Sequence, residues 1–359
     1  MAALVARNLS EHSSRLPSEI RGSFDSVYAA HFRRSLWFAA ELIRIMRRLT
    51  QKKIRAIPYK GPVLAQSAYG DLALRSFNDL DLLILPADFF RAKDALAEMG
   101  YQPSKPLPPA VERLWLGTGY ECSFDGAGGK NLVELHWRLL PYFYAVNTEA
   151  AGFRFDDLWA RAGRIGLSAE GVWGGASGEP SNDPSGVPCL NPEDSLLVLC
   201  LHAAKHLWTR LIWTADIAES LHTTNPDLAQ VIEHARALGI TRILGISLWL
   251  AGNLLGARIP AAAQRLIDQD PVVGQFAGEC AARLAGDATY DFESFDYFRE
   301  MLHLRERRAD RLRYLWRLAW TPGPGDVEAV TLHKSVFRLY HGVRVARLLQ
   351  KLMRSNLPK

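Results

Sequence analysis

Apolar positions recur at helical spacing in some segments of the chain and form short runs in others. Between Ala30 and Gln51 they recur at helical spacing among arginines, which predicts an amphipathic helix. We then expect strands over Ile54–Tyr59 and Leu80–Leu85, and helices over Pro62–Tyr69 and Pro86–Met99. Strands that alternate with helices within so few residues indicate an α/β unit.

The following segments favour an extension of the same sheet. Four prolines between residues 103 and 109 predict a loop. The strand-like runs Tyr120–Asp125 and Asn131–Arg138 come next, joined by a glycine-rich link that suits a hairpin. Gly163–Pro188 is crowded with glycine, serine and proline, and it predicts a long exposed loop between domains.

Beyond this loop the pattern becomes helical. Asn191 can cap a helix, Pro192 suits its first turn, and the two acids that follow favour the positive end of the helix dipole. Helices are expected over Ser195–Leu207, Trp213–His222, Leu228–Leu238, Ile240–Leu255, Ala261–Asp268, Val272–Leu284, Phe295–Trp320 and Val336–Met353.

These segments predict an α+β protein with a small mixed-sheet domain followed by an all-helical domain. The expected boundaries are a loose lead-in over residues 1–29, the sheet domain over 30–161, the Gly/Ser/Pro-rich loop over 162–190 and the helical domain over 191–359. Of the 359 residues, 48% are hydrophobic and 23% charged, which excludes collagen-like and wholly disordered chains.

Charge and hydropathy limit where the protein can be located and which ligands it can bind. Ile243–Ala257 is the longest stretch without a charged residue, and it is shorter than the roughly 20 apolar residues that span a bilayer. Charges interrupt the first residues before an apolar signal sequence can form, so a cytoplasmic location is expected. The net charge of +5 permits an anionic ligand such as a nucleotide but does not argue for nucleic acid.

A first candidate for chemistry is the turn Lys60–Gly61, between a predicted strand and a predicted helix. Unpaired N–H groups at the start of that helix make an anion site, glycine permits close approach, and Lys60 adds a positive charge. The alternative is an ordinary tight turn from strand to helix.

Two acids stand at the head of the next predicted strand. Asp79 and Asp81 lie two residues apart, so both carboxylates point to one side while Leu80 points to the core. Adjacent anions repel each other unless a cation lies between them, and Mg²⁺ favours carboxylate and phosphate oxygens. The alternative is a solvated turn that contains this spacing by chance.

Glu134 supplies a third acid, and it shares one face of its predicted strand with His136. A strand next to the one that carries Asp79 and Asp81 would bring Glu134 beside them. Three carboxylates can hold two metal ions about 4 Å apart, the arrangement that clamps both oxygens of an in-line phosphoryl displacement. Alternatively, Glu134 is an exposed strand residue and His136 a hydrogen-bonded core histidine.

These motifs carry a resemblance. Lys-Gly at 60–61, Arg-x-x-x-Asp-x-Asp at 75–81 and Glu-x-His-Trp at 134–137 resemble the nucleotidyltransferase superfamily that includes DNA polymerase β. The closer resemblance is to its bacterial branch of uncharacterised nucleotidyltransferases, in which Lys-Gly stands where most relatives carry Gly-Ser. The resemblance extends through residues 201–217 of the helical half and to Leu339–Arg347 near the end.

The resemblance implies a role for each matched residue. Asp79 and Asp81 are expected to bind the Mg²⁺ ion that holds a triphosphate, and these two acids together with Glu134 are expected to bind a second Mg²⁺ ion, which activates the acceptor hydroxyl. The turn Lys60–Gly61 is expected to hold the β- and γ-phosphates, with Arg75 as a further phosphate or base contact. Such chemistry depends on positioning and charge neutralisation more than on a protein nucleophile.

A second cluster lies in the helical half. His202, Lys205, His206 and Arg210 fall on one face of a predicted helix and its exit, and Asp216 follows in the next helix. In one interpretation Lys205, His206 and Arg210 meet the nucleotide or acceptor across a cleft, and Asp216 orients one of them. In the other, His202 is a core histidine and Arg210 pairs with Asp216.

Two further patterns allow other interpretations. His202 and His206 have the spacing of a helical zinc pair, to which His136 can be added, but the glutamate of an H-E-x-x-H motif is missing. The segment Arg305–Arg317 alternates cations with apolar residues, which suits either a helix packed on the domain or one that meets RNA, an acidic protein or a membrane surface.

The sequence thus predicts an Mg²⁺-dependent enzyme that moves a nucleoside monophosphate from an NTP to an acceptor and releases pyrophosphate. The resemblance implies an acceptor that is a small molecule, a peptide or protein, or RNA, and a shared fold does not select among these classes. Two alternatives remain: a nucleotide-binding or RNA-binding protein without transfer activity, and a metal-dependent phosphohydrolase.

Overall fold

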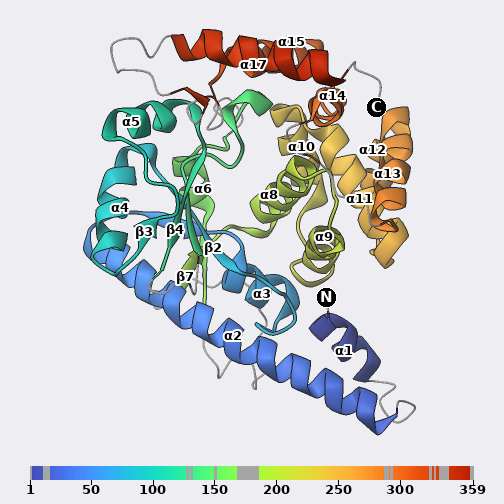
Figure 1. Ribbon diagram of the computed structural model, residues 1–359. Coiled ribbons are helices and arrows are strands. Elements are labelled where there is room, and N and C mark those ends of the chain that lie inside the picture. Colours follow the sequence, from blue (N-terminus) through green and yellow to red (C-terminus); the bar gives the residue numbers. More distant parts are fainter. Residues whose placement is uncertain are drawn as a thin grey trace.

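The computed structural model of the chain describes residues 2–10, 17–126, 129, 132–148, 152–167, 186–286, 291, 294–322, 326, 329–330 and 339–355. Figure 1 shows a sheet at the left, the helices α8 to α13 at the right, and α15 and α17 across the top. The fold class is α+β, as predicted.

The sheet has five strands in the order β1-β2-β5-β4-β3. Their bounds are β1 Ala56–Pro58, β2 Asp79–Ile84, β3 Gln102–Pro103, β4 Glu121–Asp125 and β5 Leu132–His136. Strands β2 and β5 pair in parallel, and every other neighbouring pair is antiparallel. The predicted hairpin of β4 and β5 is confirmed.

Within the described ranges, six helices accompany the sheet. They are α1 Ala2–Ser10, α2 Ser18–Gln51, α3 Gly61–Tyr69, α4 Phe89–Ala97, α5 Pro109–Thr118 and α6 Phe155–Arg161, with short 3₁₀ turns at Pro86–Asp88 and Tyr142–Tyr144. Alternate strand residues Leu80, Leu82, Val133 and Leu135 are buried in one apolar core together with residues of α2 and α4. The intervening residues of β2 and β5 therefore face the opposite side, toward α8.

The first residues differ from the loose lead-in that the sequence predicts over 1–29. The structure has α1 there, and α2 begins at Ser18 rather than near Ala30. None of the described residues between 17 and 30 is buried, so this part of α2 lacks the apolar stripe on which a sequence-based prediction depends. Ala3 and Leu4 of α1 are buried, and the Tyr28 hydroxyl donates to Asp71.

The structure also differs from the prediction in the proline-rich segment and at the two ends of the predicted interdomain loop. The proline-rich segment ends in α5, because Pro109 occupies its first turn, where a missing N–H costs nothing. At the predicted interdomain loop, β6 Gly163–Ile165 pairs antiparallel with β7 Val187–Cys189. The rest of that loop, residues 168–185, lies outside the described residues.

The second half is helical. Its helices are α8 Pro192–Lys205, α9 Leu211–Thr223, α10 Leu228–Leu238, α11 Thr241–Leu255, α12 Ala261–Gln269, α13 Pro271–Leu284, α14 Phe295–His303, α15 Arg308–Trp320 and α17 Tyr340–Ser355. The predicted cap of α8 is confirmed, since the Asp194 N–H donates to Asn191 Oδ1 at 2.9 Å. Among the helices of the described ranges, none is both long and apolar enough to cross a lipid bilayer.

The single helix predicted over Phe295–Trp320 is two helices, α14 and α15. The chain breaks between them so that Leu304 and Arg305 turn inward, where both are buried. Arg305 Nη1 donates to the Tyr144 carbonyl at 3.2 Å, a contact that ties this break to the sheet half of the chain.

Candidate active site

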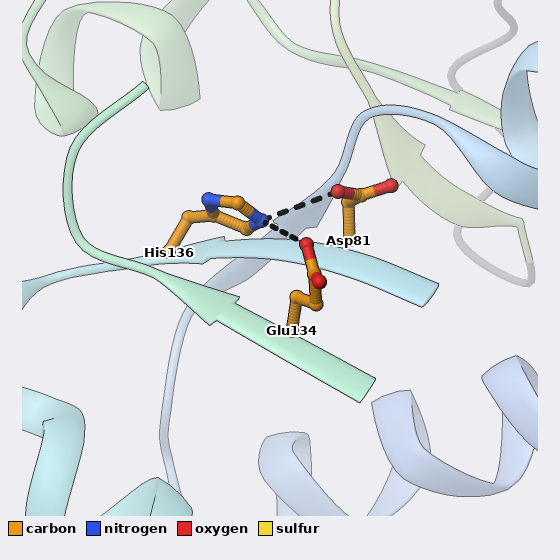
Figure 2. A group of neighbouring side chains, drawn as sticks. All are labelled: Asp81, Glu134 and His136. Atoms are coloured by element: carbon orange, nitrogen blue, oxygen red, sulfur yellow. Dashed lines mark hydrogen bonds and ion pairs between the residues drawn. The ribbon is translucent and has the colours of Figure 1, made fainter. Parts of the chain in front are cut away.

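Acidic side chains of the two parallel strands converge on one cavity. Asp81 of β2 and Glu134 of β5 are direct register partners, and Asp79 shares the Asp81 side of its strand. All three line a cavity of about 440 Å³ between the sheet and α8. In Figure 2 the ring of His136 lies beside the two carboxylates and directs its Nε2 atom at both, 3.2 Å from Asp81 Oδ1 and 3.3 Å from Glu134 Oε2.

Lys60 enters the same cavity from the start of α3. Its Nζ atom lies 2.7 Å from Asp81 Oδ1 and 3.4 Å from His202 Nδ1. The next residue, Gly61, has φ +60°, and a Cβ there would lie 3.3 Å from the Asp79 carbonyl oxygen. Glycine is therefore needed for the turn that brings Lys60 to the acids.

The two aspartates titrate differently because their partners differ. Burial raises the pKa of Asp79 to about 6, and the neighbouring charge of Asp81 adds to this shift. Burial also acts to raise the pKa of Asp81, but Lys60 and His136 outweigh it and hold that pKa below its usual value. In return the acids hold the pKa values of Lys60 and His136 above their ordinary values, although burial opposes this.

The residues present fit a divalent cation. Asp81 is 1% exposed, and its Oδ2 atom is buried without a hydrogen-bond partner among the described residues. A buried carboxylate oxygen in this state is costly unless a cation satisfies it. Asp79 and Glu134 line the same cavity, and carboxylate oxygens are the ligands that Mg²⁺ prefers.

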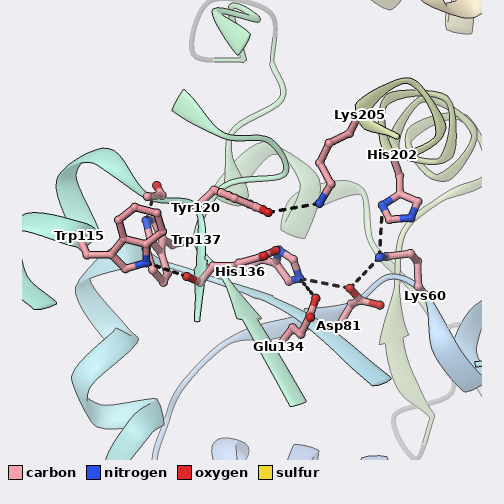
Figure 3. Close-up of polar contacts among 11 residues, drawn as sticks. Lys60, Asp81, Trp115, Tyr120, Glu134, His136, Trp137, His202 and Lys205 are labelled. Carbon is pink, nitrogen blue, oxygen red and sulfur yellow. Dashed lines mark hydrogen bonds and ion pairs between the residues drawn. The ribbon is translucent and has the colours of Figure 1, made fainter. Parts of the chain in front are cut away.

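The opposite wall of the cavity carries the predicted cations. His202, Lys205, His206 and Arg210 all line the cavity, at the end of α8 and the start of α9. Figure 3 shows two of them, His202 and Lys205. Lys205 Nζ lies 3.5 Å from the Tyr120 hydroxyl and 4.9 Å from the centre of that ring. Arg210 lies over the Trp213 ring, and His206 stacks against the same ring at 4.7 Å.

Burial disfavours the charged forms of three residues of this opposite wall, His202, Lys205 and His206. It lowers the pKa of His206 to about 3, with the charge of Lys205 as the next cause. It also lowers the pKa of His202, helped by Lys60, and that of Lys205, although Glu121 opposes the shift at Lys205. Both histidines are therefore neutral at pH 7.

Arg75 and Asp216 form a buried pair that the sequence did not predict. Arg75 Nε and Nη2 donate to the two Asp216 oxygens at 2.8 and 2.9 Å, and the Tyr69 hydroxyl adds a bond of 2.7 Å. Among the described residues Asp216 therefore pairs with Arg75 instead of Arg210, the partner that the sequence suggested. Arg75 also lines the cavity, and two of its donors are bonded to Asp216.

Sequence reasoning gave too little weight to His136 and missed Glu121. The ligating atoms of Asp81, Glu134 and His136 lie within 4.8 Å of one another, and Glu121 Oε2 is 3.3 Å from His136 Nδ1. The register that pairs Glu121 with His136 depends on the length of the loop between β4 and β5, and the sequence pattern does not determine that length. In the described part of the chain, His202 and His206 form no such group with His136, so the zinc alternative gains no support.

Two tyrosines hold the end of α8 in place. The Tyr297 hydroxyl of α14 donates to the Lys205 carbonyl at 2.8 Å, and the Tyr144 hydroxyl donates to the same oxygen at 3.3 Å. The two hydroxyls also contact each other. Lys205 thus takes its position from one residue of the sheet half of the chain and one residue of the helical half.

A sequence model of the family described as uncharacterised nucleotidyltransferase matches residues 1–256. The chain belongs to this family. The match includes the acids, the Lys60–Gly61 turn and the cations of α8, and it confirms the predicted resemblance. In contrast to the prediction, it covers the first 29 residues and ends before Leu339–Arg347. No curated protein and no solved structure matches the chain.

Proposed function

We propose that this nucleotidyltransferase moves a nucleoside monophosphate from an NTP to an acceptor and releases pyrophosphate, with the help of divalent cations. The family supports nucleotidyl transfer in general. One observation carries the proposal for particular residues: Asp79, Asp81 and Glu134, from two parallel strands, line one cavity together with Lys60. We expect the enzyme in the cytoplasm.

The acidic wall would hold the cations. Asp79 and Asp81 would bind the Mg²⁺ ion that carries the triphosphate, and Glu134 would join them at a second Mg²⁺ ion. Bound there, these ions would neutralise charge on the phosphoryl oxygens and activate the acceptor hydroxyl. The buried Oδ2 atom of Asp81 supports this role, because it is an acceptor that no described donor satisfies.

The cations of the cavity would hold the phosphates. In the structure Lys60 neutralises Asp81, and on nucleotide binding its ammonium group would move to a β- or γ-phosphate oxygen. The N–H groups at the start of α3 add an anion site at the turn Lys60–Gly61. Lys205 and Arg210, together with the neutral ring of His206, would contact the nucleotide or acceptor from the opposite wall, and Arg75 would position Asp216 and α9.

The test uses the full chain with Mg²⁺, each α-labelled NTP and a host extract, and it measures pyrophosphate release and the size fraction that takes up label. We expect transfer to fall about 10³-fold in Asp79→Asn and Asp81→Asn, because each loses a carboxylate charge that would hold the cations, and these cations would neutralise the reacting phosphates. Asp125→Asn is the matched control, since Asp125 is an exposed aspartate of the same sheet outside the cavity lining.

Each outcome distinguishes the candidates. The labelled fraction identifies the acceptor as a small molecule, a peptide or protein, or RNA. Unchanged Mg²⁺-dependent transfer in both variants contradicts the assignment of these acids. Release of inorganic phosphate or of a nucleoside monophosphate without a labelled acceptor favours a phosphohydrolase. Salt-sensitive RNA binding without pyrophosphate release favours a binding protein.

A further inference from the structure

His136 lies beside the two acids Asp81 and Glu134, at a position from which it could supply a third ligand to a cation that they bind. Its Nε2 atom is 3.2 Å from Asp81 Oδ1 and 3.3 Å from Glu134 Oε2. Neighbouring ligands of an octahedral ion with bonds of about 2.1 Å lie about 3 Å apart, so these separations are close to those of ligands that share one ion. The three atoms therefore need little movement to bind a cation between them.

Glu121 provides the partner that a ligating imidazole needs on its other nitrogen. Its Oε2 atom lies 3.3 Å from His136 Nδ1. Both atoms are buried, and neither has a hydrogen-bond partner among the described residues. Histidines that bind metal through one ring nitrogen almost always direct the other N–H at a carboxylate, a carbonyl or water, which fixes the tautomer and raises ligand basicity.

The imidazole ring is also held in place. His136 is 2% exposed, and its ring packs edge-on against Tyr59, with ring centres 5.4 Å apart. It is the register partner of Leu83 in β2 and of Glu121 in β4, so the sheet fixes its backbone on both sides. A ring held in this way loses little freedom on binding a cation.

We propose that His136 binds the cation of Asp81 and Glu134 through Nε2, and that this site prefers a first-row transition-metal ion to Mg²⁺. The inference deepens the proposed function and rests on it for the role of the cation. An imidazole nitrogen raises affinity for transition metals, whereas Mg²⁺ prefers oxygen ligands throughout. On binding, the Nε2 proton leaves to solvent and the Nδ1–H donates to Glu121.

The test measures binding of Mn²⁺ alone to the full chain, without nucleotide or acceptor. Mn²⁺ is the weakest binder of the first-row series, which makes it a stringent probe of the preference. Loss of the free-ion electron paramagnetic resonance signal gives the Mn²⁺ affinity, and competition gives the Mg²⁺ affinity. Electron spin echo modulation then shows whether a ¹⁴N nucleus is coupled to the bound ion.

We expect wild-type protein to bind Mn²⁺ at least tenfold more tightly than Mg²⁺, with ¹⁴N coupling. His136→Gln should weaken Mn²⁺ binding about 100-fold, abolish the coupling and change Mg²⁺ binding less than threefold. Glu121→Gln should weaken Mn²⁺ binding about tenfold and keep the coupling. His222→Gln, an exposed histidine of α9 outside the cavity, is the matched control.

The measurement on the wild-type protein tests the proposal even if a variant does not fold. Bound Mn²⁺ without ¹⁴N coupling, equal affinity for Mn²⁺ and Mg²⁺, or no Mn²⁺ binding at all overturns the proposal. An equal loss of both metals in His136→Gln does the same, since it indicates a structural role. Because no nucleotide is present, these outcomes are distinct from failure of nucleotidyl transfer: an enzyme that uses Mg²⁺ through oxygen ligands alone keeps its function and contradicts only this inference.

Discussion

The two walls of the cavity carry opposite charges and hold them by different means. On the sheet wall, Asp81 is fixed by its strand neighbours and bonded to Lys60 and His136, so it keeps its charge despite burial. On the helix wall, Lys205 and Arg210 lie against aromatic rings. The acids of the sheet wall are therefore held by charged partners, whereas Lys205 and Arg210 of the helix wall are long side chains held against aromatic rings.

The largest effect is expected where the two halves are joined, at Arg75 and Asp216. Arg75→Met leaves the Asp216 carboxylate buried without its ion pair, which should lower the free energy of unfolding by about 3–5 kcal/mol. Urea denaturation measures this loss, and the double change Arg75→Met with Asp216→Leu should recover most of it. Wild-type stability combined with weak NTP binding would instead place Arg75 with the cations that bind phosphate.

A smaller effect is expected from the helix wall itself. Arg210→Met should weaken NTP binding about tenfold, because one charge-assisted contact to a phosphate contributes roughly 1.5 kcal/mol. Isothermal titration with NTP and Mg²⁺ measures the change. Arg265→Met, at an exposed arginine of α12, is the matched control. Equal affinities in the two variants would show that Arg210 serves only its contact with Trp213.

The smallest effect is a dependence of stability on pH that comes from His206. Burial holds its pKa at about 3 in the folded protein, below the ordinary value of 6.5. The neutral ring of His206 therefore contributes fully to the free energy of unfolding above about pH 6.5. This contribution is lost as the pH falls from that value toward 3, because the unfolded chain binds a proton at His206 before the folded protein does. Between pH 7 and 5, wild type should lose about 1 kcal/mol more than His206→Phe, allowing for solvent around the ring. Urea denaturation at both pH values measures the difference, and identical losses would contradict it.

Much of the acidic wall follows from the sequence alone. The period of two along a strand places Asp79 with Asp81, and Glu134 with His136, whatever the rest of the fold does. That β2 and β5 are neighbours, with Asp81 opposite Glu134, depends on a parallel pairing across some 50 residues, which local pattern does not determine. Periodicity therefore predicts which residues share a face of each strand. The prediction that the acids of the two strands meet depended on the order of the motifs along the chain.

The contacts that sequence reasoning missed are all long-range. The partner of Asp216 is Arg75, which lies 141 residues away, and nothing in either local pattern selects it. Glu121 reaches His136 through the exact length of a hairpin, which includes residues outside the described ranges. The helix break at Arg305 has a similar cause, because the tertiary contact with Tyr144 overrides a continuous helical pattern.

The hydroxyl of Tyr297 connects the last hundred residues to the wall of the cavity. It belongs to α14, outside the stretch that the family model matches, yet it grips the backbone oxygen of Lys205. A chain cut after residue 256 would retain every acid of the cavity and lose this anchor. A displacement of α14 that breaks this hydrogen bond would therefore remove one of the contacts that hold Lys205 at the cavity.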